Sequence, residues 1–138
     1  MISTRSFLVL LATCAGSAFG APLTYTVVDN SSSLLMNQAS SDALWREHAS
    51  ARLMRLYPVK KWGFVSEVEG GFDDAKNCVI TARAMMLPRT GKTLVYRPAK
   101  TATAFGIQPG ASQQQCRAFA TTKLREAIGA VNSALLAE

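Results

Sequence analysis

The longest regular pattern in the chain is an apolar stripe near its C-terminus. Apolar residues recur there at intervals of three and four, which is the spacing of one face of a helix. Ser112 stands before the stripe and Gln115 lies three residues further on, as in a capping box. The stripe consists of Cys116, Phe119, Ala120, Leu124, Ala127, Ile128, Val131 and Leu135. The pattern predicts a long amphipathic helix that begins at Ser112.

A second apolar face with helical spacing lies in the first half of the chain. Its members follow one another at four, four and three residues: Trp45, Ala49, Leu53 and Leu56. Ser40 or Ser41 is a suitable N-cap residue, and Pro58 cannot continue a helix. The pattern predicts a helix from residue 40 or 41 to Tyr57.

Alternation of apolar and polar residues predicts strands. Residues 62–69 and 78–87 alternate regularly, and residues 23–28 form a shorter β-rich run. In the central strand, 78–87, Cys78 and the even-numbered residues up to Met86 share one mostly apolar face. We expect this face to contact the helices.

A turn signal follows the central strand. Residues 88–91, Pro-Arg-Thr-Gly, carry proline early and glycine late, as β-turns do. We therefore expect residues 93–97 to return along the central strand and to form a β-hairpin over residues 78–97. Pro98 suggests a bend or an edge position, and residues 100–105 are a candidate for one more strand.

Three apolar residues of the central strand fall on its opposite face: Val79, Met85 and Leu87. Apolar side chains on the outside of a sheet need a cover or a partner. We expect residues 34–36, Leu-Leu-Met, to cover them. The alternative is an apolar binding patch, in which the flexible side chain of Met85 suits an adaptable contact.

Two cysteines fall on surfaces that are expected to pack together. Cys78 lies on the apolar face of the central strand, and Cys116 lies in the first turn of the C-terminal helix. In an exported chain such a pair is typically a disulfide. The inferred fold is α+β, an antiparallel β-meander with two helices packed on one face and one disulfide.

The N-terminus has the three zones of a secretory signal peptide. One cation, Arg5, precedes an apolar run at residues 7–15, and residues 18–20 fit a small-x-small cleavage pattern. The apolar run is shorter than the roughly 18 residues needed to span a bilayer. The sequence predicts a signal peptide at 1–20 and a single domain at 21–138, in a periplasmic or secreted protein without a transmembrane segment.

Cys14 leaves an alternative open for the N-terminus. Residues 11–14, Leu-Ala-Thr-Cys, resemble a bacterial lipobox, in which cleavage leaves a lipidated cysteine. Thr13 departs from the Gly, Ala or Ser that normally precedes the cysteine. We therefore expect the soluble form, with a lipoprotein as the alternative.

Basic residues outnumber acidic ones. One of the fifteen basic residues, Arg5, is lost with residues 1–20, which leaves fourteen against nine acidic residues. One group of cations follows the first predicted helix: Arg52, Arg55, Lys60 and Lys61. Another lies on or near the predicted hairpin: Arg83, Arg89, Lys92, Arg97 and Lys100. Such surfaces attract an anionic protein or glycan. Nucleic acid is not expected, because the chain is exported and lacks aromatic residues interleaved with these charges.

No catalytic, metal or cofactor motif is complete in the sequence. His48 is the only histidine, whereas a zinc site needs three or four ligands. A Gly-x-Ser-x-Gly elbow is absent. Glu67 and Glu69 share one face of a predicted strand, and paired carboxylates can act as acid and base in sugar hydrolysis. We therefore expect no cofactor and no metal, and keep a small secreted hydrolase of cell-envelope polymer as the alternative function.

The sequence favours a non-enzymatic binding module over an enzyme. The expected module recognises a protein or an anionic glycan, as an inhibitor, an immunity protein or an envelope-accessory protein does. Its expected contact residues are cations of the hairpin and neighbouring apolar residues: Arg83, Arg89, Lys92, Arg97, Val79 and Met85. A flat charged sheet face is expected for such a module, whereas an enzyme requires a cleft that converges on Glu67, Glu69 or His48.

Overall fold

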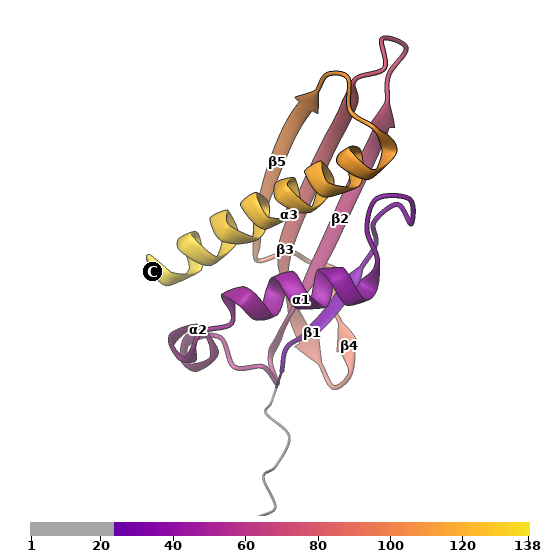
Figure 1. Cartoon of the computed structure of the whole chain (residues 1–138). Coiled ribbons are helices and arrows are strands. Elements are labelled where there is room, and N and C mark those ends of the chain that lie inside the picture. The colour runs from indigo at the N-terminus through magenta and orange to yellow at the C-terminus, as the bar shows by residue number, and fades with distance from the viewer. Residues whose placement is uncertain (1–23) are drawn as a thin grey trace, which may run out of the picture.

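A sheet with helices on one of its faces makes up the domain (Figure 1). The computed structural model describes residues 24–138, so the predicted signal peptide, its cleavage site and Cys14 lie outside the described residues. In chain order the elements are β1 (Thr26–Asp29), α1 (Gln38–His48), α2 (Ala51–Leu56), β2 (Trp62–Phe72), β3 (Cys78–Thr90), β4 (Thr93–Leu94), β5 (Lys100–Gln108) and α3 (Gln113–Leu136). The predicted α+β class is confirmed.

The strands lie in the order β1-β2-β3-β5, and β4 pairs only with the end of β3. β2, β3 and β5 are antiparallel neighbours, as the predicted meander requires. β1, however, runs parallel to β2. The reason is the helical connection α1–α2, because a crossover of this length returns the chain to the end at which β1 began. The sheet is therefore mixed.

The turn after β3 lies later in the chain than predicted. β3 continues through Pro88 to Thr90, and only residues 93–94 return beside it. Pro88 is tolerated because it lies at the end of the ladder between β2 and β3, where one donor fewer is needed. β2 lies along one side of β3. The strand along its other side is therefore β5, and not residues 93–97.

α1 and α3 lie on the same face of the sheet, with α3 crossing β3 and β5 (Figure 1). The single helix predicted before Tyr57 is divided into α1 and α2, because Ala49 has an extended backbone and Ser50 caps a new helix. The N-cap of α1 is Asn37, in place of a serine at position 40 or 41. The predicted capping box at Ser112 is present at the start of α3.

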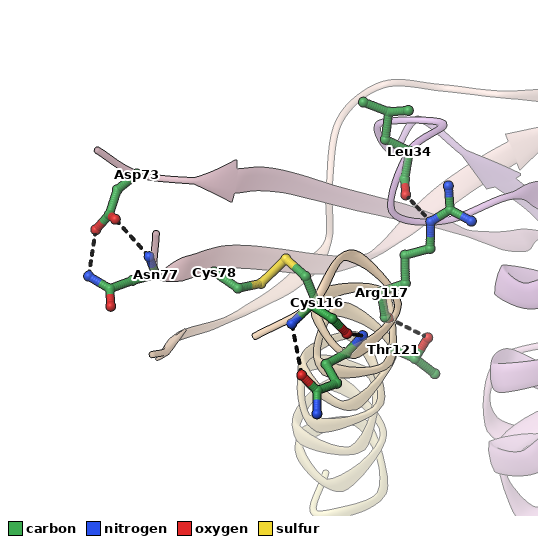
Figure 2. The surroundings of a disulfide bond; sticks show 9 residues. Leu34, Asp73, Asn77, Cys78, Cys116, Arg117 and Thr121 are labelled. Carbon is green, nitrogen blue, oxygen red and sulfur yellow. Dashed lines mark hydrogen bonds between the residues drawn. A yellow bond between two sulfur atoms is a disulfide. The ribbon is translucent and has the colours of Figure 1, made fainter. Parts of the chain in front are cut away.

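The main core lies between α3 and the face of β3 that contains Cys78. The even-numbered residues of β3 from 78 to 86 are buried there, as predicted. The disulfide between Cys78 and Cys116 is confirmed, with Cα atoms 5.6 Å apart (Figure 2). A second tie is the Arg117 side chain, whose Nε donates to the Leu34 carbonyl at 2.8 Å. The first turn of α3 is therefore fixed both to the sheet and to the loop before α1.

A smaller apolar cluster lies on the opposite face of the sheet. Val65, Met85 and Leu87 are buried there beneath Leu94 of the β4 hairpin. Gly63 leaves room for this cover, since a Cβ at that position would lie 2.5 Å from Leu94 Cδ2. The expectation that residues 34–36 cover this face is therefore wrong. Two of those residues, Leu35 and Met36, are buried in the main core instead.

Candidate functional site

Six basic residues gather at one end of the domain, which we call the basic end. They come from α2, from the loop that follows it, and from the β3–β4 hairpin with the loop after it: Arg55, Lys60, Lys61, Arg89, Lys92 and Arg97. All are exposed except Arg89, which is half-buried. The ion pairs found among residues 24–138 involve none of these six side chains.

Arg89 brings the two parts of the basic end together. Its Nη1 donates to the Val59 carbonyl at 2.9 Å, and its Nε donates to the Gly91 carbonyl at 2.6 Å. Its backbone N–H donates to the Lys61 carbonyl at 2.7 Å. The side chain thus ties the hairpin turn to the loop between α2 and β2. Parts of the two groups of cations recognised in the sequence are therefore neighbours, whereas Arg83 and Lys100 pair with Glu67 and Glu138 elsewhere.

Charge is distributed unevenly along the length of the sheet. The basic end lies at the β3–β4 turn, whereas the opposite end is the β2–β3 turn with Asp73 and Asp74 (Figure 1). Asn77 donates to Asp73 from its side chain and its backbone, and these hydrogen bonds lower the pKa of that carboxyl group. Asp73 therefore stays ionised, and this turn, which also contains Lys76, carries less positive charge than the basic end.

Arg83 lies apart from the basic end, on the sheet face opposite the helices, which we call the open face. It stands across from Glu67 in the β2–β3 register, and its Nη1 lies 3.2 Å from Glu67 Oε2. The other oxygen of Glu67 accepts a hydrogen bond from the Tyr96 hydroxyl. That bond is the main cause of the raised pKa of Tyr96, with burial second. The charge of Arg83 is thus balanced locally.

The apolar contact residues proposed from the sequence have different surroundings. Met85 is buried beneath Leu94, so it supports the surface from below and does not present an exposed contact. Val79 is half-buried and pairs with Ile107 of β5. Ile107 and its neighbour Phe105 are exposed by 52% and 60%. Phe105 and Ile107 of β5 therefore contribute accessible apolar surface to the open face, together with Tyr96 and Val28.

Sequence reasoning missed Phe105 and Ile107 as surface residues. Residues 101–104 alternate threonine with alanine, and continuing that period of two places Phe105 and Ile107 on the threonine face, which is the signal that could have found them. The sequence predicts a candidate strand at residues 100–105, which stops short of Ile107. The structure shows β5 reaching Gln108 instead.

The residues of the alternative enzymatic function do not converge on a cleft. Both carboxylate oxygens of Glu67 are engaged by Arg83 and Tyr96, while Glu69 is exposed further along the open face. His48 lies on α1, with its Nδ1 3.1 Å from the Leu44 carbonyl oxygen. Within residues 24–138 no group of three or more potential ligands could hold a metal ion.

Comparisons with protein-family models, with curated proteins and with solved structures find no match to this chain. None of the helices among residues 24–138 combines the length and the apolar character needed to cross a bilayer.

Proposed function

We propose that this protein is an exported, non-enzymatic binding module that recognises an anionic envelope component, either an acidic glycan or an acidic protein surface, through its basic end. Two features support export: the signal-peptide pattern at residues 1–20 and the disulfide, which is typical of oxidising compartments.

The observation that carries the proposal is the basic end itself. Six cations lie on two segments of the chain that Arg89 holds together, and the ion pairs found among residues 24–138 involve none of them. Like charges repel one another, so this arrangement costs stability unless an anion neutralises it. Arg89, Lys92 and Arg97 keep the role that the sequence suggested. Arg83, whose charge is balanced by Glu67, and Val79, which lies at the other end of β3, are not part of the basic end.

The proposal is tested with two defined polyanions, polygalacturonate and lipopolysaccharide. The variant combines Lys60→Gln, Lys61→Gln, Lys92→Gln and Arg97→Gln, which leaves the structural contacts of Arg89 intact. We expect it to bind at least one of the polyanions about tenfold more weakly at low ionic strength, since each exposed cation contributes Coulomb attraction. Binding by the unchanged protein should weaken as salt is added.

A control variant removes four cations from other surfaces: Arg46→Gln, Lys76→Gln, Lys123→Gln and Arg125→Gln. It has the same net charge as the first variant, and we expect its affinity to stay within about twofold of the unchanged protein. Equal weakening in both variants would assign binding to net charge and contradict a specific site. Failure of the unchanged protein to bind either polyanion at low salt would also contradict the proposal.

A further inference from the structure

A groove separates the free edge of β1 from the helices α1 and α2. Its cavity has a volume of about 310 Å³. Backbone and side chains of residues 24–27 form one wall. The facing wall is formed by Asp42, Trp45 and Arg46 of α1, by Ala49, and by Met54 of α2. The groove is distinct from the basic end, and its function is independent of the one proposed above.

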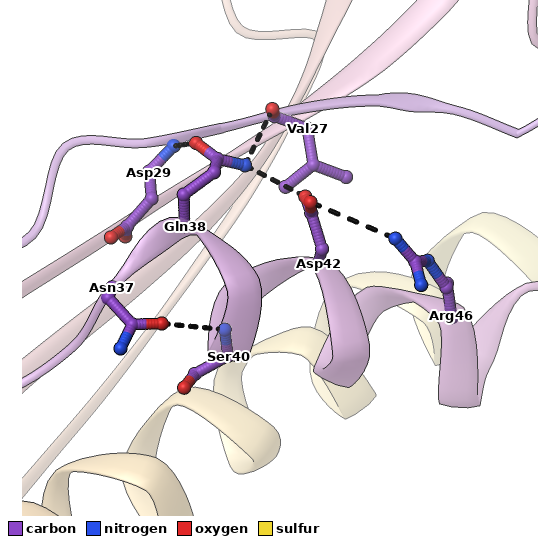
Figure 3. Close-up of polar contacts among 7 residues, drawn as sticks. All are labelled: Val27, Asp29, Asn37, Gln38, Ser40, Asp42 and Arg46. Carbon is purple, nitrogen blue, oxygen red and sulfur yellow. Dashed lines mark hydrogen bonds and ion pairs between the residues drawn. The ribbon is translucent and has the colours of Figure 1, made fainter.

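Part of the β1 edge is already paired by a side chain (Figure 3). The Gln38 amide nitrogen donates to the Val27 carbonyl at 3.0 Å, and the Gln38 amide oxygen accepts from the Asp29 N–H at 3.0 Å. In a parallel sheet one residue makes the same two bonds with its backbone. Its N–H donates to the carbonyl of one residue on the neighbouring strand, and its carbonyl accepts from the N–H two residues further along that strand. Asp42 fixes this arrangement by accepting a second hydrogen bond from Gln38 at 2.8 Å.

The next pair of backbone groups on the same edge opens into the groove. Asn30 donates its N–H to Ser66 of β2, so even-numbered residues of β1 face β2 and odd-numbered ones face away. The Tyr25 carbonyl and the Val27 N–H therefore continue the edge that Gln38 occupies. No hydrogen bond found among residues 24–138 uses either group. They are spaced to take one residue of an incoming strand.

The side chains of the groove define what that strand carries. Trp45, Ala49 and Met54 provide an apolar wall that suits one apolar side chain. Arg46 is 70% exposed, and its only ion pair in the described part of the chain is a long one of 3.8 Å to Asp42. An acidic side chain of the occupant is complementary to Arg46 and to the positive net charge of the protein.

The geometry points to a peptide-binding groove, in which an extended, acidic segment of a partner protein adds to the sheet beside β1, bonds to Tyr25 and Val27, and places an apolar side chain against Trp45 and Met54. Addition of a strand to a free sheet edge is an established mode of peptide recognition. Main-chain bonds supply part of the affinity in this mode, and the pocket and Arg46 supply the selectivity.

The test uses a phage-displayed library of random dodecapeptides against the full chain, purified in the form that the producing cell accumulates. Enriched peptides are synthesised and titrated. We expect sequences with an apolar residue near Asp or Glu, and we expect binding to slow hydrogen exchange at the Val27 amide. Val27→Pro removes that N–H without removing a bond to β2, and it should weaken binding at least about tenfold. Val27→Ala keeps the N–H and is the matched control, with a smaller loss.

Gln38→Ala provides a second, opposite test, because it frees the Val27 carbonyl and the Asp29 N–H for a longer strand. Peptide affinity should be equal or higher in this variant.

Equal binding by Val27→Pro and Val27→Ala would overturn the inference. So would slower hydrogen exchange at amides of β5 instead of β1 when peptide binds. Protection of the Val27 amide in the peptide-free monomer would assign the groove to the chain's own N-terminal residues. Concentration-dependent protection would assign it to a second copy. Either of these results also overturns the inference.

Discussion

The Ser66 hydroxyl is a polar group in the middle of the core. It is fully buried on β2 and lies beneath α1. The Trp45 indole N–H donates to it at 2.9 Å, and the Ser41 hydroxyl donates to it at 2.7 Å. Trp45 also stacks on Phe64, with ring centroids 4.0 Å apart. One acceptor on the sheet therefore fixes the position of α1 by two hydrogen bonds.

Ser66→Val should lower the free energy of unfolding by about 2–3 kcal/mol. Valine is larger than serine, so the substitution overpacks the core, and it also leaves two buried donors, on Trp45 and Ser41, without an acceptor. Urea denaturation measures the change. Ser33→Val, at an exposed position, is the control and should change stability by less than about 0.5 kcal/mol. A loss as small as that of the control would mean that the two donors are satisfied without Ser66.

The sequence predicted the face of Ser66 but not its partners. The alternation in residues 62–69 puts Ser66 on the same face as Phe64 and Val68, and both of these are buried. The partners of the hydroxyl lie 25 and 21 residues earlier in the chain. A periodic pattern gives the orientation of a residue within its own element. It carries no information about which side chain of another element will meet it.

At the scale of elements, those with a long repeating pattern were predictable. β3 and α3 repeat their apolar period over many residues, so their faces followed from the sequence. β4 has only two residues, too few to show a period, and its hairpin was misplaced. The parallel pairing of β1 depends on how α1 and α2 pack. The break at Ser50 was missed because the apolar spacing continues across it.

The disulfide joins the two elements that were predicted best. Closing its loop of 38 residues restricts the unfolded chain, which stabilises the fold by about 3–4 kcal/mol. The double variant Cys78→Ala and Cys116→Ala should therefore lose about that much in urea denaturation. Complete reduction of the unchanged protein should cause a similar loss and should leave the variant unaffected. A loss below about 1 kcal/mol would mean that the packing of α3 on β3 holds the fold by itself.

At the scale of the whole molecule, the uneven charge has a consequence for stability. The cations of the basic end repel one another, and this repulsion is screened by salt. The variant with glutamine at 60, 61, 92 and 97 should melt roughly 2 °C higher than the unchanged protein at low ionic strength. Thermal melts at increasing salt should show the difference shrinking. A lower melting temperature in the variant would indicate that these side chains have structural contacts.

The sequence identified the cations of the candidate site but not their grouping. The sequence predicts Arg89 only as a residue that contacts a partner. In the structure two nitrogens of its guanidinium group also donate hydrogen bonds, to the Val59 and Gly91 carbonyls. Val59 lies 30 residues away in the chain, so no local pattern connects the two positions. The groove beside β1 was likewise hidden, because it depends on the parallel crossover that the sequence did not reveal.

The bond between β3 and α3 also bears on how the protein is made. From residue 24 onwards the chain has only two cysteines, Cys78 and Cys116, so oxidation has a single intramolecular product. Such a chain needs a thiol oxidant but no enzyme that reshuffles wrong pairs. Cys116 also follows every strand, so a chain that emerges N-terminus first presents its whole sheet before the bond can close. Removal of the proposed signal peptide at residues 1–20 would take Cys14 with it and keep that product unique.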